Sequence, residues 1–591
     1  MFVNPNKNRI RMVDAAIGRI PCDLSLENAK LVNVITGEIY DAAVDIIDGI
    51  IVRVRDDGRP AALPSKKTVD CGGRYLVPGF IDTHMHVEST MMVPENFGKL
   101  AVLWGTTTAS TDPHEIGNVM GIDGVTYMLD SSTRSPMRQY VLAPSCVPAV
   151  PAVEHAGADF FAPEVADMLE RDGVIGIAEI MDYVGVYMND PRMSGIIEEG
   201  LKRNMFLQGH SPSVTKDKLD AYLCAGPVSC HEARSGEEVI EKLRLGMHIN
   251  VKSSSLSDTA KAIVEGIRYL PCKDYVSICT DDVHAYDLLH TGHLNHVVHV
   301  CIEHGLAPID AIRCATFNAA REYNFQDIGA IVPGYIADIQ VLDDLDPVGY
   351  PHEVYCAGVL KARDGKLVED TESVAEYPHI NTVNIPQIQS EDDFLLKAPV
   401  ESGEVNALIF DTARSAMRPG QPAVYEKLPV KNGFVDLSGR PDLRYVIVVD
   451  RHGHGTKTIV AASHFLVDGA IASTISHDSH NLTVCYSDKE SAYAAARELE
   501  RVGGGMCVAK GGKVVATLPL PVAGLMSPLP CAQLASDIAA FNRSLSDICQ
   551  DGDDMLLRIA VMALPVRPGY ILTDMGVVNG DEQTFTPLFK D

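Results

Sequence analysis

Positive charge is scarce in this sequence. Its 591 residues carry 50 Lys and Arg against 79 Asp and Glu, which gives a formal net charge of -29. Proteins that bind nucleic acids need a basic face, because it displaces counterions from the phosphates. We find no such patch in the sequence, and we therefore expect no nucleic-acid partner.

Long apolar runs and paired cysteine motifs are also missing. No run approaches the ~20 apolar residues that span a membrane, and the basic N-terminus lacks the apolar stretch of a secretory signal. The 14 cysteines are scattered, without any Cys-x-x-Cys, in a chain long enough to bury a large core. We expect a cytoplasmic protein without membrane association, whose thiols are free and mostly buried.

The central part of the sequence alternates strand-like runs with amphipathic helical stretches. The runs lie at 76–86, 106–110, 140–147, 174–180, 206–210, 228–232, 248–252 and 276–282. This pattern predicts an α/β fold, a (β/α)8 barrel over residues 78–330. In such barrels the catalytic groups lie at the carboxyl ends of the strands.

The flanking segments predict two further domains. Short β-branched runs separated by Gly-containing turns occupy residues 23–77 and return after residue 331, which predicts one small β-sandwich with residues 1–77 as its first part. Its second part and a linker would cover residues 331–390, with a polar stretch at 370–395 as the best linker candidate. Residues 391–591 predict a separate C-terminal α+β domain.

Potential metal ligands stand where the predicted barrel strands stop. Alternate residues of a strand share a face, so His84 and His86 project to the same side. One such residue alone is more often a satisfied core or loop residue, but six at strand ends favour a metal site. The six residues are His84, His86, Glu179, His210, His231 and Asp281.

Four imidazoles and two carboxylates are enough to hold two divalent ions. His84, His86 and Asp281 would hold one ion, His210 and His231 the other, and Glu179 would link them. Such a site lowers the pKa of bound water toward neutrality and positions it for attack. Asp281 could also take the proton and pass it to the leaving group, so the prediction is hydrolysis by a metal-activated hydroxide.

The run Pro78-Gly79-Phe80-Ile81-Asp82-Thr83-His84-Met85-His86, with the later histidines and Asp281, resembles the amidohydrolase superfamily. This resemblance implies a metal-bearing (β/α)8 barrel with a flanking β-sandwich. Residues 87–90, 111–115, 477–481, 503–513 and 518–525 resemble the bacterial adenine deaminase family more closely than its relatives. The similarity runs over nearly the whole chain.

The resemblance implies a substrate and a cofactor. Adenine, a small-molecule purine base, and water would give hypoxanthine and ammonia, a reaction of purine salvage. The metals implied are Mn²⁺ or Fe²⁺ rather than Zn²⁺, although imidazole and carboxylate ligands suit several divalent ions, Zn²⁺ included. Glu179 stands where many superfamily members carry a carboxylated lysine. A homo-oligomer, specifically a dimer, is also expected.

Two alternatives stay open at this point. Another cyclic-amide or N-acyl hydrolase of the superfamily would keep every metal ligand and change the loops, and a strongly cationic pocket would favour it. A scaffold without activity would usually have lost metal ligands, and all six are present in this sequence.

The sequence gives less information about the residues that contact the substrate and about those that surround the metal ligands. A purine needs donors and acceptors aimed at its ring nitrogens, so Glu88 and Asp282 are the first candidates for substrate binding and, with Asp281, for catalysis. His114, His477 and His480 are candidates for the surroundings of the metals. Our hypothesis is that the C-terminal domain lays the cluster His477 to Asn481 over the barrel mouth.

Overall fold

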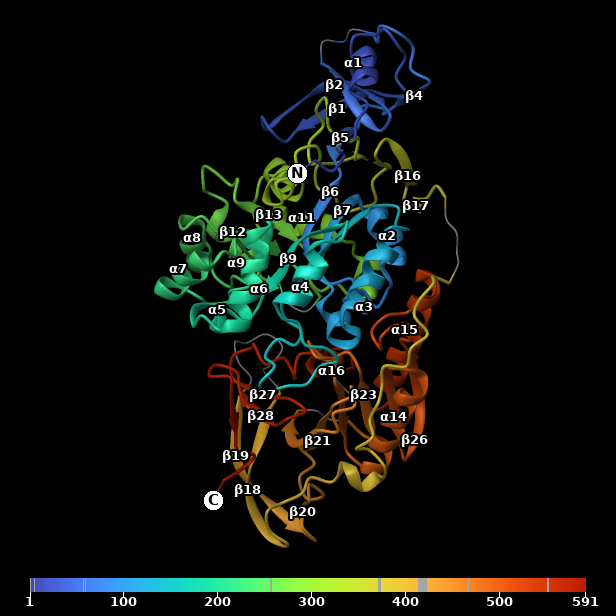
Figure 1. Ribbon diagram of the computed structural model, residues 1–591. Coiled ribbons are helices and arrows are strands. Elements are labelled where there is room, and N and C mark those ends of the chain that lie inside the picture. The colour runs from blue at the N-terminus through green and yellow to red at the C-terminus, as the bar shows by residue number, and fades with distance from the viewer. Residues whose placement is uncertain are drawn as a thin grey trace.

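The computed structural model stacks three parts along one axis, with an N-terminal sheet at one end and a C-terminal region at the other (Figure 1). It describes residues 2–4, 6–56, 58, 60–255, 258–369, 374–412, 422–464, 467–549 and 552–590. Residues 370–373 of the predicted linker lie outside the described residues. None of the described helices is long and apolar enough to cross a membrane.

The N-terminal sheet draws its nine strands from two distant segments of the chain. Strand β5 pairs antiparallel with β14, which brings residues 75–78 beside residues 339–342. The chain therefore leaves this sheet after β5 and returns to it at β14. The elements are α1 (Arg9–Ala16), β1 (Leu24–Asn33), β2 (Glu38–Ile47), β3 (Ile50–Arg55), β4 (Lys67–Asp70), β5 (Tyr75–Pro78), β14 (Ile339–Leu342), β15 (Glu353–Cys356), β16 (Val359–Arg363) and β17 (Lys366–Leu367).

The stretch 76–86, predicted as one strand, is two strands in different sheets. Strand β5 ends at Pro78, and β6 (Phe80–Met85) starts a parallel sheet. The break follows from the hydrogen bonds: the Gly79 amide donates to the Asp338 carbonyl, 2.9 Å away, whereas the Phe80 amide donates to the Gly105 carbonyl at 3.0 Å. The two histidines thus belong to the central part alone.

The central part contains eight parallel strands in two sheets. One sheet has the order β10-β9-β8-β7-β6 and the other β11-β12-β13. A parallel bridge between Met85 and Asp281 links β6 to the residues after β13. The strands are β7 (Thr106–Thr111), β8 (Arg138–Ala143), β9 (Val174–Ile180), β10 (Phe206–Gly209), β11 (Ser229–Cys230), β12 (His248–Lys252) and β13 (Val276–Cys279).

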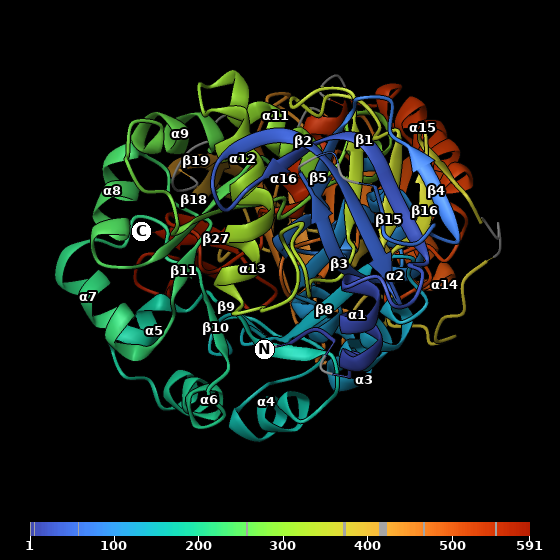
Figure 2. The same cartoon turned by 90° about the horizontal axis from the view of Figure 1, so that it is seen from above.

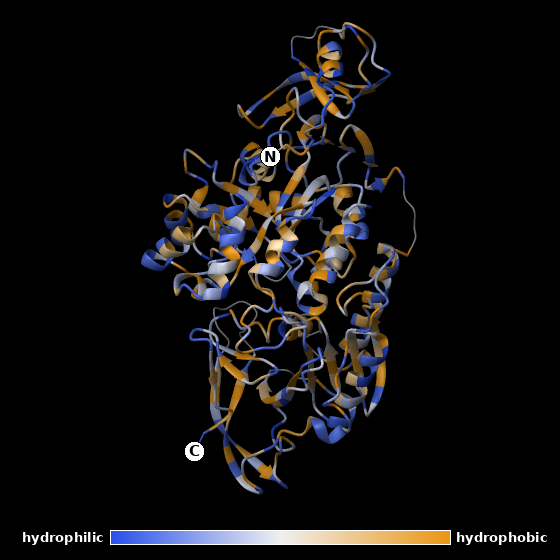
Figure 3. Ribbon diagram, in the orientation of Figure 1, coloured by the Kyte–Doolittle hydropathy of each residue, from blue (hydrophilic) through white to orange (hydrophobic). Residues whose placement is uncertain are grey.

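These strands are buried on both faces, as expected for parallel strands covered by helices. All seven residues of β9 are buried, for example. Helices α4 to α9 lie outside the strands (Figure 2), and α7 and α8 at the outer edge carry many hydrophilic residues (Figure 3). The helices are α2 (Pro94–Ala101), α3 (His114–Ser132), α4 (Ala162–Leu169), α5 (Tyr183–Tyr187), α6 (Pro191–Lys202), α7 (Lys216–Ala225), α8 (Gly236–Arg244), α9 (Ala260–Ile267), α10 (Ala285–His290), α11 (Leu294–Glu303), α12 (Pro308–Arg313) and α13 (Ala319–Glu322).

The C-terminal region is built on a second large sheet of ten strands, to which a three-stranded sheet is added. Its strands are β18 (Gly403–Asp411), β19 (Ala423–Lys431), β20 (Phe434–Val435), β21 (Leu443–Val449), β22 (Lys457–Ser463), β23 (Ala470–Ser473), β24 (Leu482–Tyr486), β25 (Gly505–Lys510), β26 (Lys513–Pro519), β27 (Tyr570–Leu572), β28 (Val577–Asn579), β29 (Thr584–Thr586) and β30 (Phe589–Lys590). Its helices are α14 (Lys489–Val502), α15 (Cys531–Ser546) and α16 (Gly552–Ala560).

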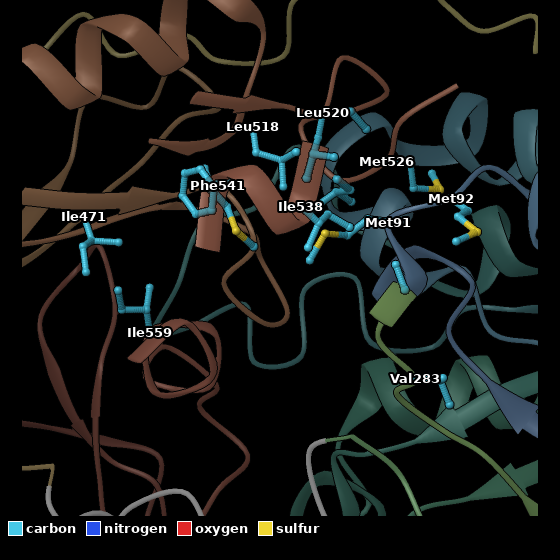
Figure 4. Close-up of a cluster of buried hydrophobic side chains, with 14 of the residues drawn as sticks. Met91, Met92, Val283, Ile471, Leu518, Leu520, Met526, Ile538, Phe541 and Ile559 are labelled. Atoms are coloured by element: carbon cyan, nitrogen blue, oxygen red, sulfur yellow. The ribbon is translucent and has the colours of Figure 1, made fainter. Parts of the chain in front are cut away.

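One hydrophobic core joins the central and C-terminal parts. Met91, Met92 and Val283 from the central part belong to the same buried cluster as Leu518 and Ile538 (Figure 4). Burial of this shared apolar surface stabilises the contact between the two parts. The carboxyl ends of the parallel strands lie on this side, so the C-terminal region covers the end where the predicted ligands stand. The 14 cysteines, all within the described residues, form no disulfide, and most are buried, as expected.

Candidate metal centre

Glu179, near the end of β9, stands at the centre of a buried group of imidazoles. Its Oε2 lies 2.6 Å from His210 Nδ1 and 3.2 Å from His231 Nε2. Its Oε1 lies 3.4 Å from His86 Nε2. The carboxylate thus faces both halves of the predicted ligand set, with one oxygen toward each.

His84 and His86 present their Nε2 atoms to the same carboxylate oxygen. Both atoms lie 3.2 Å from Asp281 Oδ1. On the other side of the rings, His84 Nδ1 is 2.8 Å from Gln208 Oε1, and His86 Nδ1 is 3.1 Å from the Asp112 carbonyl. Since both outer partners are acceptors, we assign the ring protons to Nδ1, which leaves the Nε2 lone pairs directed into the cluster.

His231 connects the two histidine pairs. Its ring stacks on His84 with centroids 4.0 Å apart, and it lies edge-on to His210 at 5.2 Å. Burial lowers the pKa of His231 to about 4, and the nearby His84 acts in the same direction. A neutral imidazole is the form that binds metal ions.

Asp281 follows the end of β13 and has a left-handed backbone with φ of 60°. Residues other than glycine adopt this conformation infrequently, although aspartate and asparagine do so more often than most, and such conformations cluster at active sites. Burial alone would raise the pKa of the Asp281 carboxyl, but the Lys252 ammonium and the His84 and His86 rings hold it well below its usual range. The carboxylate is therefore ionised, as a metal ligand must be.

The cluster fits divalent metal ions. The described residues His84, His231 and Asp281 form one group whose ligand atoms all lie within 4.8 Å of one another, and Glu179, His210 and His231 form another. His84 Nε2 is buried without a hydrogen-bond partner among the described residues, which is what an imidazole aimed at an ion would show. Imidazole nitrogens and carboxylate oxygens suit several first-row divalent ions.

The two predicted substrate contacts lie directly beside this cluster. Glu88 follows His86 in a short 3₁₀ turn (Glu88–Thr90), and its Oε1 accepts a hydrogen bond from the Ile116 amide at 3.2 Å. Burial, reinforced by the Glu115 charge, raises the pKa of Glu88 to about 8. The carboxyl therefore carries a proton near neutral pH. Its Oε2 has no hydrogen-bond partner in the described part of the chain.

Asp282, the second predicted substrate contact, is hydrogen-bonded to a residue outside the metal cluster. Its Oδ1 accepts a hydrogen bond from the Ser89 hydroxyl at 2.5 Å. The same hydroxyl lies 3.3 Å from Glu115 Oε1. Burial raises the pKa of the Asp282 carboxyl, and the Asp281 charge adds to the effect.

His114 begins helix α3 and is 2% exposed, rather than lying in an open loop. Its Nδ1 is 3.1 Å from Asp112 Oδ2 and 3.7 Å from Glu179 Oε1. His86, Asp112, His114 and Glu179 form a further group with the spacing of a metal site. His114 therefore contacts the cluster itself.

His477 and His480 come from the loop between β23 and β24 and meet the central part at Glu115. His477 Nδ1 is 3.0 Å from Glu115 Oε1, and His480 Nε2 is 3.8 Å from Glu115 Oε2. Asp478 reaches closer to the centre, since its Oδ1 lies 3.5 Å from His114 Nε2. The C-terminal loop thus lies against the cluster, as the hypothesis of a covered barrel mouth requires.

Sequence reasoning assigned no role to three residues that the fold brings to the cluster. Asp112 follows β7, and Lys252 is the last residue of β12, so the strand-end rule would have found both. Glu115, by contrast, lies in the first turn of α3, and only its contact with His477 reveals it.

Comparison with known proteins places this fold and site in a class. Residues 75–383 match the amidohydrolase family, and residues 422–584 match the adenine deaminase C-terminal domain. The first match covers all eight parallel strands and every residue of the proposed metal cluster.

Full-length relatives narrow the class. An adenine deaminase of Desulfatibacillum aliphaticivorans is 35% identical over 586 residues, covering 98% of this chain and 99% of the relative. An adenine deaminase of Moorella thermoacetica is 36% identical over 574 residues, covering 96% of each chain. The chain belongs to the adenine deaminase branch of the amidohydrolase family.

Proposed function

We propose that this protein hydrolyses adenine to hypoxanthine and ammonia. The observation that carries the proposal is Glu179, which is buried between two histidine pairs in a chain similar over 98% of its length to a protein named adenine deaminase. The same reasoning makes a purine base the substrate and purine salvage the role of the reaction. We further propose that the protein is cytoplasmic and forms a homodimer.

Two divalent ions, Mn²⁺ or Fe²⁺ with Zn²⁺ as the third choice, fit this cluster. His84, His86 and Asp281 would hold one, His210 and His231 the other, and Glu179 would face both. When bound, the ions would lower the pKa of a water molecule and position it for attack.

The proposed architecture is a closed (β/α)8 barrel over residues 78–330, a flanking sandwich of residues 1–77 and 331–390, and a C-terminal domain of residues 391–591.

The chain's own groups supply proton transfer and substrate orientation. The C6–O bond forms first and makes C6 tetrahedral, and the C6–N bond then breaks. Of the two protons of the attacking water, one must reach the leaving amine, which departs as ammonia, and the other must reach N1 as C6 becomes the carbonyl of hypoxanthine. Asp281, whose Oδ1 faces the cluster, is placed to carry the proton that reaches the amine. Glu88, protonated near neutral pH, donates to a ring nitrogen of the base, and Asp282 accepts from its N–H groups.

The charges beside the cluster favour a neutral substrate. The Asp282 and Glu115 carboxyl groups lie there beside the protonated Glu88, whereas the buried cation Lys252 is already paired with Asp281 and Glu232. An N-acyl amino acid would bring its carboxylate toward these acidic groups, while a purine would bring N–H donors. Adenine is therefore favoured over an acidic amide.

The direct test is ammonia release from adenine, with adenosine, guanine and cytosine as controls. Protein stripped of metal is expected to be inactive, and reloading with Mn²⁺ or Fe²⁺ is expected to restore release from adenine alone. If metal binds to the cluster but no base releases ammonia, the deaminase proposal is wrong and cyclic amides become the next substrates to assay.

A second prediction concerns Glu88. The change Glu88→Gln keeps the shape and an N–H donor but removes the acidic proton that the carboxyl can transfer, so turnover should fall about 10²- to 10⁴-fold. Metal content, measured by plasma mass spectrometry, should stay at the wild-type level, because Glu88 is outside the proposed ligand set. Turnover near the wild-type value would remove Glu88 from the mechanism.

A further inference from the structure

Lys252 is a buried cation at the edge of the metal cluster. It is the last residue of β12 and is 2% exposed. Its Nζ lies 2.7 Å from Asp281 Oδ2 and also contacts Glu232 Oε1. A buried ammonium is costly unless it is fully paired, and these two carboxylates pair it.

The two oxygens of Asp281 have different partners. Oδ1 faces His84 Nε2 and His86 Nε2, each at 3.2 Å, whereas Oδ2 faces Lys252. A carboxylate can rotate about its terminal bond, so contacts on one oxygen determine the direction of the other. Lys252 therefore determines which oxygen is directed into the cluster.

The other carboxylate held by Lys252 belongs to the strand that carries a proposed ligand. Glu232 directly follows His231 after β11, and Asp281 follows β13. Lys252, at the end of the intervening strand β12, thus joins three neighbouring strand ends through one ammonium.

We propose that Lys252 is a positioning residue for deamination, which holds Asp281 Oδ2 so that Oδ1 is presented to the metal cluster and the reacting water. The inference rests on the proposed function for its activity readout only. Partners that orient metal ligands from outside typically contribute about 10- to 100-fold to metal affinity or activity.

The variant Lys252→Met separates this role from simple metal retention. It removes a positive charge close to divalent ions, which favours metal binding and offsets the affinity lost when Asp281 is less well oriented. We expect a full metal complement, kcat lowered about 10- to 100-fold, KM for adenine within about threefold and a changed visible spectrum in Co²⁺-loaded protein. Lys252→Arg, which keeps the charge and the donors, should recover most of the turnover and the wild-type spectrum.

Arg55→Met is the matched control, since Arg55 is a buried cation (6% exposed) paired with buried Asp45 in the distant N-terminal sheet. It should change stability but neither the Co²⁺ spectrum nor kcat. If Lys252→Met does not fold, Lys252→Gln, which keeps one donor group, takes its place with the same expectations.

Three results would overturn the proposal. One is a wild-type Co²⁺ spectrum together with kcat within twofold of the wild type. Another is loss of metal from the uncharged variant, and the third is a tenfold rise in KM at unchanged kcat, which would make Lys252 a substrate contact. The Co²⁺ spectrum requires no substrate, so it tests the positioning role even if adenine is not the substrate.

Discussion

Replacing Glu179 by glutamine is expected to lower adenine deamination at least about 1,000-fold and to reduce bound metal. The carboxylate contacts His210 and His231 through one oxygen and His86 through the other. Although burial favours the protonated acid, the neighbouring imidazoles, His210 first, keep the pKa of Glu179 well below its usual range. An amide cannot supply that charge, and metal ions contribute several kcal/mol to such reactions.

The measurement is metal content by plasma mass spectrometry, together with ammonia release at saturating adenine. Glu154→Gln is the control, because Glu154 is also a buried glutamate (1% exposed) of the central part, and burial raises its pKa well above the usual value. The Glu154 carboxyl is therefore protonated and uncharged, and a glutamine at this position has the same charge and nearly the same shape. Metal content and activity should thus stay near the wild-type level. Full metal content in Glu179→Gln would refute the proposed linking role.

Loss of the His477 charge is expected to weaken the contact between the C-terminal region and the central part. Burial favours the neutral ring, but the Glu115 carboxylate raises the pKa of His477 to about 9. A pKa raised above the unfolded value of about 6.5 contributes stability that is complete below pH 6.5 and is lost as the pH rises through 9. The contribution is on the order of 3 kcal/mol.

This prediction is tested by urea unfolding of the wild type and His477→Asn between pH 6 and 10. Midpoints are compared rather than free energies, because a multi-domain chain does not unfold in two states. The urea midpoint of the wild type should be higher than that of the variant at pH 6, and the difference between the two midpoints should vanish near pH 10. His248→Asn, which also replaces a 7% exposed histidine but one whose pKa burial lowers, should not reproduce this pattern. A pH-independent difference would contradict the assignment.

The shared core decides how the C-terminal region should be tested. Met91, Met92 and Val283 of the central part are buried in one cluster with Leu520 and Ile538. Removing the C-terminal region would expose this apolar surface and so destabilise the central part as well. Point variants at His477 and Glu115 therefore test the cover over the cluster more cleanly than a truncation.

Much of the site could be predicted from local pattern. Parallel strands are short apolar runs, and their carboxyl ends meet at one edge of the sheet, so the polar residue that ends each run is a candidate ligand. Glu179, His210 and His231 followed from this rule alone, and the structure brings them together. The same rule, applied fully, would also have included Lys252.

Other features depend on contacts between residues far apart in the chain. The separation of β5 from β6 follows from hydrogen bonds to Asp338 and Gly105, which the local sequence does not reveal. The pairing of Glu115 with His477 joins residues separated by more than 350 positions, so no local pattern could predict it. The sequence by itself therefore determined which residue types end the strands. Only the tertiary structure decided their partners, because packing of the C-terminal region brings its loop against the cluster.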